Sequence, residues 1–497
     1  MNGSMIELVI ARLKSAWEAI SSPDFILALR EITAVDAAEL RGAILRVPAF
    51  MDDSISNPEL GSIFDRSATD PVNAMAENIA AAYGVEKTYP GTTGTTGLNV
   101  PAVMTLAGEG EKLGIARDCH VSVVASLSLS GAEPVYLVPP YDSDIGVLLP
   151  PTRGEVAALL DTHPDVRALV LTMPTYHGLM GDIGGIVAEC HGRGVLVMVD
   201  GAHGPHFRFL RGLGFPCPAE NAGADMVTQS THKVLSALNQ GSLLHFNNLA
   251  LIPRYEEFQA MGFQSTSFSY PILLSLEHAI EQMAVDGERS WARAVELARR
   301  LREDASRIPG IRALDEAIVD GRRVVGLDPT RVTLNVRGTG RSGYEICDGL
   351  LDHGVIVEMA TADVLLFLVS PSVTDSFVDS TVQALRGVLE DARSTGRGGG
   401  AAEPTTPPAL PDRVRTPRQA MATPRERVPT REAVGRVSGE SIGCYPPGQA
   451  VFVPGELITA EAVDYLESVV EAGGHLKRVD DDHFLTIDVL CDPNPGG

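Results

Sequence analysis

The stretch GADMVTQSTHKVLSALNQGSLLHF, residues 223–246, places a single lysine, Lys233, just after an apolar run that is typical of a buried strand. Hydroxyl side chains and a histidine directly precede this lysine. A lysine in this setting is either a surface charge in a loop or an amine kept for chemistry, because a deprotonated lysine is a nucleophile. The rest of the chain decides between these two interpretations.

The composition indicates a globular protein with a large core. The chain has 497 residues, of which 44% are hydrophobic and 49 are glycines, enough for more than one domain. Its 64 acidic and 40 basic residues give a net charge of −24. This charge argues against nucleic acid as a partner, because phosphate binding needs a basic face. It also argues against an anionic membrane, whereas a cationic substrate would be attracted.

The six cysteines show no CxxC pair and no metal-ligand spacing. We therefore predict reduced thiols, a cytoplasmic protein and no metal site. The first twenty residues carry charges at helical spacing and lack the apolar core of a signal peptide. No run of about 18 apolar residues occurs, so no segment is expected to span a membrane.

Short apolar runs alternate with helical stretches between residues 75 and 245. The runs at 166–174, 194–203 and 224–233 are typical of strands that are buried on both faces. Such strands, separated by helices, predict an α/β fold with a mostly parallel sheet that is flanked by helices. A long helix is expected over residues 275–308, and a smaller α+β region after it.

The same pattern predicts the domain organisation. We expect an N-terminal helical segment over residues 1–60 and a large domain over 61–325. A small C-terminal domain would be formed by residues 326–393 and 431–497 together. Residues 394–430, between its two parts, are rich in Pro and Gly, and the first half of this linker should be flexible, with order resuming near its end.

The loop YPGTTGTTGLN, residues 89–99, is a candidate anion site. Its glycines and threonines stand before a predicted helix and offer backbone N–H groups and hydroxyls. A phosphate at a helix N-terminus needs small and hydroxylated residues of this kind. An ordinary glycine–threonine turn is the alternative interpretation.

Two other residues stand at the ends of predicted elements. Asp200 ends an apolar strand, so its carboxylate should emerge at the carboxyl edge of the sheet, where α/β proteins bind ligands. His120 precedes a helix, although a lone histidine is more often structural. Together with the anion loop and Lys233 they form the set that pyridoxal 5′-phosphate requires. The lysine binds the aldehyde, and the aspartate keeps the pyridine nitrogen protonated.

Several stretches, in their order along residues 75–470, resemble the Orn/Lys/Arg decarboxylase major-domain family, which has the aspartate-aminotransferase fold (fold type I). The stretch after His120 resembles the family's R-N-x-H-K-S motif, and the one after Asp200 resembles D-E-A-H-G-x-H-F. The similar stretches are TYPGTTGTTGLN, ARDCHVSVVASLSLSGAEPVYL, PTYHGLMGDI, VDGAHGPHFRF, DMVTQSTHKVLSALNQGSLLH and, near the C-terminus, REAVGRVSGESIGCYPPGQAVFVPGELIT.

The resemblance implies a role for each matching residue. His120 would stack on the pyridine ring, Asp200 would pair with its nitrogen, and Lys233 would bind the cofactor covalently. His203 would lie beside the catalytic face, and either it or His232 would return a proton to Cα. The phosphate would be held by Thr95, Thr96, Gly97, Ser230 and His232.

The resemblance also implies an activity and an assembly. The expected reaction is decarboxylation of arginine, lysine or ornithine, or of a modified relative, in a homodimer or an assembly of dimers. The chain resembles the shorter members, without the N-terminal wing domain. Glu456 is a candidate contact for the distal cation of the amino-acid substrate; a surface or helix-capping role is the alternative.

Three departures from the family pattern affect the substrate side. The family's H-x-P-G-H-K-x-G segment corresponds to LRVPAFMDD, residues 45–53, in which the histidines and the lysine are missing. Gly201 replaces a glutamate, and Val121 replaces a lysine. The cofactor-binding set is intact, so a decarboxylase is the first hypothesis. The alternative is retro-aldol cleavage, transamination or oxidative deamination of an unusual amino acid.

Overall fold

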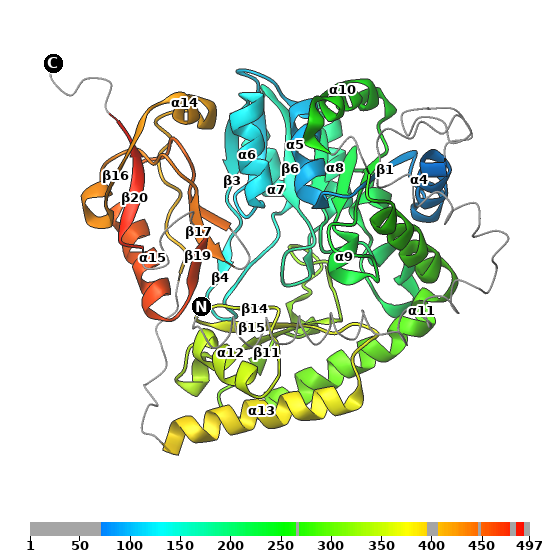
Figure 1. Cartoon of the computed structure of the whole chain (residues 1–497), viewed down its shortest axis with the longest axis vertical. Helices are drawn as coiled ribbons and strands as arrows, with labels where there is room; N and C mark the ends of the chain where they lie inside the picture. Colours follow the sequence, from blue (N-terminus) through cyan, green and yellow to red (C-terminus); the bar gives the residue numbers. More distant parts are fainter. Residues whose placement is uncertain (1–70, 265–267, 395–405, 446–448, 478–483, 492–497) are drawn as a thin grey trace, which may run out of the picture. The chain divides into compact units, whose positions relative to one another are not determined.

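The structure is a computed structural model, and it describes residues 71–264, 268–394, 406–445, 449–477 and 484–491 (Figure 1). The chain divides into two units, Met1–Ala74 and Met75–Gly497. The sheets and the cavity that the structure describes belong to the second unit. The helices expected over residues 1–60, and the segment 45–53 that departs from the family pattern, lie outside the described residues.

A seven-stranded sheet with the order β1-β10-β9-β8-β6-β2-β3 forms the centre of the large domain. The five strands from β9 to β3 run parallel, and β10 and β1 are antiparallel at one edge. The predicted runs form β6, β8 and β9, so the mostly parallel α/β sheet is confirmed. The strands are β1 Lys87–Gly91, β2 Lys112–Ala116, β3 Glu133–Leu137, β6 Val166–Thr172, β8 Leu196–Asp200, β9 Met226–Gln229 and β10 Ser242–Phe246.

Helices flank this sheet and seal its core (Figure 1). Helices α5 and α6 pack against each other, as do α7 and α8. Apolar residues of α5 and α6 meet those of the sheet in one buried cluster that includes Leu98, Leu127, Val170 and Leu244. The helices are α4 Pro71–Tyr83, α5 Gly94–Leu106, α6 Val121–Ser130, α7 Arg153–Thr162, α8 Ile183–His191 and α10 Ile252–Phe258.

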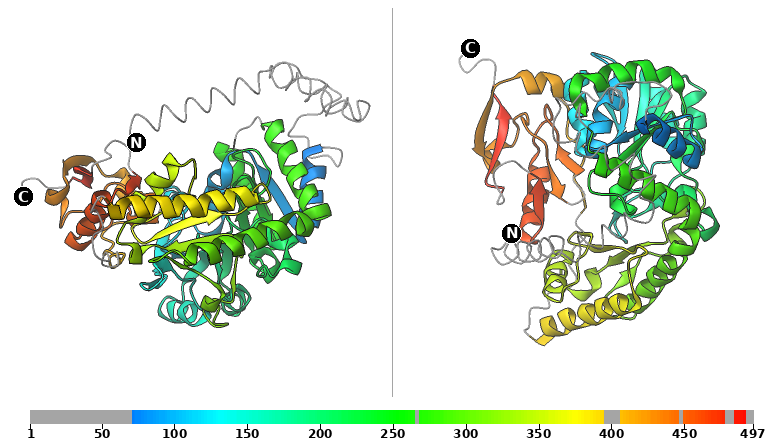
Figure 2. Two further views of the ribbon diagram at one scale, coloured as in Figure 1. Left: turned by 90° about the horizontal axis from the view of Figure 1, so that it is seen from below. Right: turned by 45° about the vertical axis from the view of Figure 1, so that its right-hand side comes forward.

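A long helix leads from the large domain to a second sheet. Helix α11, Tyr270–Ser306, confirms the helix predicted over residues 275–308. It packs alongside α13, Asp375–Ser394 (Figure 2). The second sheet has the order β11-β13-β15-β14. Its elements are β11 Arg312–Ala313, β13 Arg331–Asn335, β14 Met359–Ala360 and β15 Val364–Leu368, with α12 Gly343–Asp352 beside them.

Residues beyond 406 carry separate sheets with their own core. Ile442, Phe452, Leu466 and Ile487 are among the residues that pack there. The sequence predicted that this part joins residues 326–393 in one small domain, but the two parts contribute strands to different sheets. The elements are α14 Pro417–Ala422, β16 Arg425–Pro429, β17 Ile442–Tyr445, β18 Gln449–Phe452, α15 Ala460–Glu471, β19 His475–Lys477 and β20 Thr486–Leu490.

The prediction that order resumes near residue 430 is wrong, because α14 and β16 already precede it. Helix α14 begins with a capping box in which Thr416 and Gln419 satisfy each other's backbone N–H groups, and Pro417 follows the cap. These local signals stabilise a short helix in a segment of low apolar content. The predicted flexible half of the linker includes residues 395–405, which lie outside the described residues.

Three general features bear on the class of protein. None of the helices in the described ranges is both long and apolar enough to cross a membrane. All six cysteines are free thiols. Within the described part of the chain, no three His, Cys, Asp or Glu side chains gather in a way that would hold a metal ion.

Candidate active site

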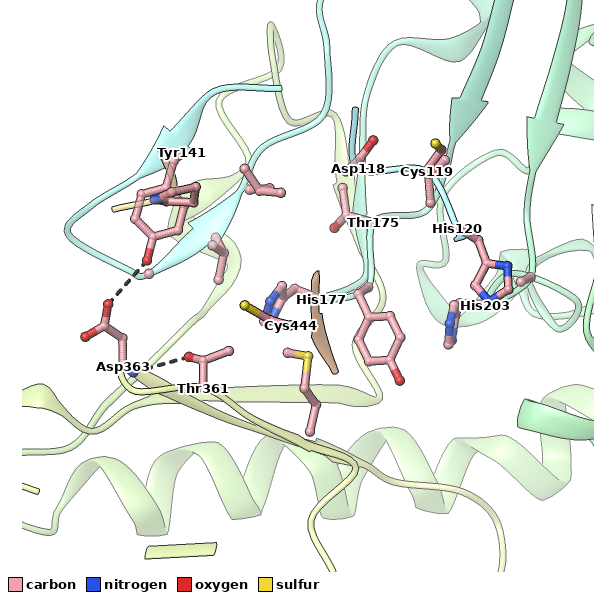
Figure 3. A pocket seen from close by; sticks show the side chains of 18 of the residues that line it. Asp118, Cys119, His120, Tyr141, Thr175, His177, His203, Thr361, Asp363 and Cys444 are labelled. Carbon is pink, nitrogen blue, oxygen red and sulfur yellow. Dashed lines mark hydrogen bonds between the residues drawn. The ribbon is translucent and has the colours of Figure 1, made fainter. Parts of the chain in front are cut away.

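The predicted site residues meet at the carboxyl edge of the parallel strands. Thr95, His120, Asp200, His203 and Lys233 all line one cavity. Figure 3 shows two of them, His120 and His203, among the side chains of this lining. The five residues come from the first turn of α5, the N-cap of α6, the end of β8 with the loop after it, and the short helix α9, Thr231–Val234. Sheet register and helix starts thus bring together residues that lie up to 138 positions apart in the sequence.

The glycine–threonine loop forms an anion cradle. Thr95, Thr96 and Gly97 belong to the first turn of α5. The backbone N–H groups of Thr95 and Thr96 stand among the first helical positions, which have no intrahelical partner. The Thr95 hydroxyl oxygen lies 2.9 Å from Ser230 Oγ, so this loop meets the lysine segment. A Cβ atom at position 97 would collide with the Thr93 side chain, so only glycine fits there.

Asp200 is held rigidly at the end of β8, with 3% of its surface exposed. Its Oδ1 accepts a hydrogen bond from the Ala202 N–H at 3.1 Å, and its Oδ2 accepts one from Asn99 Nδ2, also at 3.1 Å. The Asn99 amide also donates to Ser122 Oγ and accepts from Thr228 Oγ1. Asn99, which was not predicted from the sequence, is therefore held by α6 and β9 and in turn fixes the Asp200 carboxylate at the end of β8.

His120 caps the N-terminus of α6. Its Nδ1 accepts a hydrogen bond from the Ser122 N–H at 3.2 Å. A backbone N–H can only donate, so the ring keeps Nδ1 unprotonated and its plane is fixed. The structure thus gives His120 a capping role and also places it in the cavity wall, where a flat ring can stack on it.

Lys233 lies with its Nζ 3.2 Å from His203 Nε2. Burial by the cavity walls lowers the pKa of the Lys233 amine, and Arg331 lowers it further, whereas Asp200 and Glu358 oppose this shift. A lowered pKa increases the share of free amine, which is the nucleophilic form. Burial also lowers the pKa of His203 well below its ordinary value, and the charge of Arg331 adds to this effect.

His232 sits beside the lysine with one ring nitrogen engaged. Its Nδ1 lies 2.8 Å from the carbonyl oxygen of Gly241 and donates to it. Its Nε2 is then the nitrogen that can take up or release a proton. Burial lowers the pKa of His232, and the Gly241 carbonyl partly offsets this effect. The cavity lining includes Thr95 and Lys233, whereas Thr96, Gly97, Ser230 and His232, from the same two segments, are not among its residues.

The structure does not bring Glu456 to the cavity. The side chain is fully buried, and its Oε2 lies 2.7 Å from Arg117 Nη2. The same oxygen accepts a hydrogen bond from the Val453 N–H. This carboxylate therefore ties the C-terminal region to the end of β2, and the substrate contact predicted for it is replaced by an internal ion pair.

The far wall of the cavity comes from other parts of the chain. Tyr141, Tyr344, Cys444 and Tyr465 line it, together with Asp363. Figure 3 shows Tyr141 bonded to Asp363, with an oxygen–oxygen distance of 3.3 Å. These residues lie between 90 and 232 positions from Lys233, so no local sequence pattern could have indicated them.

A carboxylate missed by sequence reasoning lies beside this lining. Glu358 accepts a hydrogen bond from the Tyr176 hydroxyl at 2.8 Å, and Tyr176 lines the cavity. Glu358 is close enough to Lys233 to raise the pKa of its amine. It precedes the strand β14 in the stretch VIVEMA, which has no obvious binding signature.

Asp118 is a further buried carboxyl group in the cavity wall. Burial raises its pKa to about 7, and the charge of Asp200 contributes. One of its oxygens, Oδ1, is buried without a hydrogen-bond partner among the described residues. The family motif R-N-x-H-K-S has asparagine at this position.

We expect Asp118→Asn to stabilise the protein at alkaline pH. A carboxyl group whose pKa is raised in the folded state binds its proton more tightly there, so stability is lost as pH rises from about 4 to about 7. The loss is at most about 4 kcal/mol. Urea unfolding should therefore show the variant to be more stable than the wild type at pH 8 and equal to it near pH 4. An equal gain at both pH values would show that packing, not titration, is responsible.

The residues present fit pyridoxal phosphate. The cradle at the start of α5 suits a phosphate, the fixed Asp200 carboxylate suits a protonated ring nitrogen, and the Lys233 amine suits an aldehyde. Several buried hydroxyl oxygens around the site also have no hydrogen-bond partner among the described residues and so could serve a ligand; these are Thr93 Oγ1, Thr172 Oγ1 and Thr231 Oγ1.

Known proteins resemble this chain over most of its length. The Orn/Lys/Arg decarboxylase major domain matches residues 47–376, and the C-terminal domain of the same family matches residues 406–476. The chain is 32% identical to an arginine decarboxylase of Halalkalibacterium halodurans, covering 88% of this chain and 89% of the relative. It is 30% identical to an arginine decarboxylase of Bacillus subtilis, covering 86% and 87%.

Solved structures show the same fold. The constitutive lysine decarboxylase of Escherichia coli superposes with a TM-score of 0.72 at 23% identity, covering 99% of this chain and 85% of that one. The lysine decarboxylase of Francisella novicida gives a TM-score of 0.71 at 22% identity, covering 88% and 74%. Taken with the two family matches, which span most of the sequence, these findings show that the chain belongs to the Orn/Lys/Arg decarboxylase family.

Proposed function

We propose that this protein is a pyridoxal-phosphate-dependent decarboxylase that converts a basic amino acid into an amine and CO2. One observation carries the proposal. The amine of Lys233, the fixed carboxylate of Asp200, the ring of His120 and the anion cradle at Thr95 surround a single cavity. Relatives of this chain are named arginine decarboxylase and lysine decarboxylase, which supports a substrate with a cationic side chain.

Each residue has a distinct task in this proposal. The first turn of α5 and Ser230 bind the phosphate, Asp200 holds the ring nitrogen in its protonated form, and Lys233 binds the aldehyde carbon. When bound, the cofactor accepts the electron pair that loss of CO2 leaves on Cα. The cavity walls orient the substrate so that the bond to its carboxylate is the one that breaks.

The proton that returns to Cα is assigned to His232. Its Nε2 is not engaged by the Gly241 carbonyl, which binds the other nitrogen. His203 is less suited, because Arg331 and burial keep its ring neutral by lowering its pKa. His203 instead contacts Lys233 and holds it in place.

Glu358 is the proposed contact for the distal cation of the substrate. The Tyr176 hydroxyl already orients one of its oxygens, Oε1. A carboxylate near a cavity in a protein of net charge −24 attracts a guanidinium or ammonium group. The carboxylate that sequence reasoning offered for this task, Glu456, is engaged by Arg117 instead.

We expect Glu358→Gln to raise the KM for basic amino acids about 10- to 100-fold with little change in kcat, because a charge-assisted hydrogen bond contributes about 1.5–3 kcal/mol. Initial-rate measurements with arginine, lysine and ornithine test this. Citrulline is a neutral relative of arginine, and its KM should exceed that of arginine in the wild type but be similar to that of arginine in the variant. Glu303→Gln, on the exposed face of α11, is the control. An unchanged KM in Glu358→Gln would refute the assignment.

The proposal also includes a homodimer, or an assembly of dimers, in the cytoplasm. The apolar side chains of Leu238 and Leu274 are about half exposed close to the lysine segment. Their segments lie close together, since the Leu238 N–H donates to the hydroxyl oxygen of Ser275, the residue after Leu274, at 2.9 Å. A second subunit that covers this surface would close the site. Light scattering that shows a fully active monomer would contradict the dimer.

The substrate is identified by a panel of amino acids. The purified protein, supplied with pyridoxal phosphate, is incubated with arginine, lysine, ornithine, citrulline and norleucine. Mass spectrometry should show the corresponding amine for one or more of the three basic substrates. Amines from norleucine at a comparable rate would contradict a cation-selective site.

A further inference from the structure

Arg331, the first residue of β13, is a cation buried directly behind the site, with 1% of its surface exposed. Its Nη1 donates to the carbonyl oxygen of Tyr176 at 2.7 Å. Its Nη2 lies 2.9 Å from His203 Nδ1. The nearest countercharge is Asp328, whose Oδ2 lies 3.5 Å from Arg331 Nε and 3.0 Å from His206 Nε2. Burying a guanidinium is unfavourable unless it is paired and hydrogen-bonded. Here both Nη atoms have hydrogen-bonding contacts, whereas Nε has only the ion pair with Asp328 and no hydrogen-bond partner among the described residues.

The contact with Arg331 determines which nitrogen of His203 carries the proton. A guanidinium has N–H donors and no acceptor, and it stays charged at any pH at which a protein is folded. His203 Nδ1 must therefore accept, and the single proton of the neutral ring lies on Nε2. Low exposure supports the neutral form, since only 5% of the His203 surface is accessible.

The tautomer in turn affects Lys233. His203 Nε2 lies 3.2 Å from Lys233 Nζ, and an Nε2–H group can only donate to it. A neutral amine has a lone pair that accepts this bond, whereas an ammonium group would place two donors against each other. Asp200 and Glu358 act in the opposite direction and favour the ammonium form by raising the pKa of the amine. Among the described residues, Arg331, His120 and His206 also act on the charge of His203, and the ring of Tyr176 packs edge-on against it with the ring centroids 4.5 Å apart.

We propose that Arg331 is a positioning residue that acts through His203 to hold Lys233 as a neutral amine. The free amine attacks an aldehyde carbon and forms a carbon–nitrogen bond. The aldehyde oxygen then leaves as one water that carries the two protons of the amine. This inference rests on the proposed role of Lys233. A purely structural alternative is that Arg331 only anchors β13 to the segment before β7, Leu179–Met180, by its bond to Tyr176.

The first test measures the tautomer in the full-length protein without cofactor. Nitrogen-15 NMR of labelled histidines, with the His203 signal assigned from a His203→Gln variant, should show the proton of the His203 ring on Nε2. A proton on Nδ1 would overturn the proposal. This measurement needs neither cofactor nor activity, so it stands whether or not the proposed function holds.

The second test follows the pH dependence of colour development when pyridoxal phosphate is added to the protein. In Arg331→Met the midpoint of the rate against pH should move up by about one pH unit. Below the wild-type midpoint the variant should then react about tenfold more slowly than the wild type, and at high pH the two rates should be equal. Arg331→Lys, which keeps a donor and a charge, should return the midpoint most of the way to the wild-type value. If Arg331→Met does not fold, the smaller shift expected for Arg331→Lys is measured instead.

Arg117→Met is the matched control, because Arg117 is also a largely buried arginine in an ion pair. It should lower the melting temperature without moving the midpoint. If Arg331→Met and Arg331→Lys lower the melting temperature but keep the wild-type midpoint, Arg331 is only an anchor and the proposal is wrong. If the wild type itself gains no colour, the proposed function fails, and the NMR result alone decides the role of Arg331.

Discussion

Replacing Lys233 by alanine should abolish the yellow colour of the protein in the presence of pyridoxal phosphate and reduce decarboxylation by more than about 10³-fold. The reason is the position of its amine, which is the group in the cavity wall best placed to form a covalent bond with an aldehyde. Absorption spectra and borohydride reduction followed by peptide mass mapping measure the attachment directly.

Two controls make this result specific. Lys233→Arg keeps a long, nitrogen-bearing side chain but cannot bond covalently to the aldehyde, because the guanidinium stays protonated, so it should behave like the alanine variant. Lys112→Ala removes a surface lysine that pairs with Asp165 and should leave the colour intact. Reduced cofactor attached to a lysine other than Lys233 in the wild type would refute the assignment.

The second large effect is expected at Asp200. Its carboxylate accepts hydrogen bonds from Asn99 and from the Ala202 N–H, so it is fixed at the strand end where a ring nitrogen can meet it. Asp200→Ala should lower kcat by about 10³-fold, because a ring that is not protonated is a weak acceptor of electrons. Steady-state kinetics and a titration of cofactor binding measure the two consequences separately.

An N-methylated pyridoxal phosphate provides a sharp test of this role. Its ring nitrogen is permanently positive, so it should restore a large part of the activity of Asp200→Ala. Asp225→Asn is the control, since Asp225 is also a buried aspartate of this sheet but bonds to the Val197 N–H and to His191. It should affect stability and leave the spectrum unchanged. Full activity of Asp200→Ala with the natural cofactor would contradict the proposed role.

The fold was predictable because its signals are local. The apolar runs that became β6, β8 and β9 are buried at nearly every position, and the pattern of a doubly covered strand shows in a few residues. The position of Lys233 follows from the end of β9. The antiparallel β10, which begins nine residues after Lys233, was not predicted, because a short apolar run does not reveal its direction.

The residues that surround the site were not predictable in the same way. Asn99, Arg331 and Glu358 act through side-chain contacts with residues more than a hundred positions away. Such contacts depend on the tertiary structure and leave no periodic pattern. The opposite error occurred at Glu456, where a family motif suggested a substrate contact but burial beside Arg117 gives it a partner within the chain.

One sequence signal was present and was overlooked. The segment T-P-R-Q at Thr416 to Gln419 has the hydroxyl and amide spacing of a capping box, with proline at the first helical position. It marks the start of α14 inside the stretch that its composition suggested to be a linker. Local capping chemistry therefore outweighs a low apolar content over a few residues.

The central claim is that this site breaks the bond between Cα and the carboxylate of a basic amino acid. The most direct test is to supply arginine, lysine or ornithine labelled with carbon-13 at the carboxylate to the protein loaded with pyridoxal phosphate. The account predicts that labelled CO2 is released in a one-to-one ratio with an unlabelled amine, and that Lys233→Ala releases neither. A keto acid that keeps the labelled carbon would contradict it and indicate transamination or oxidative deamination.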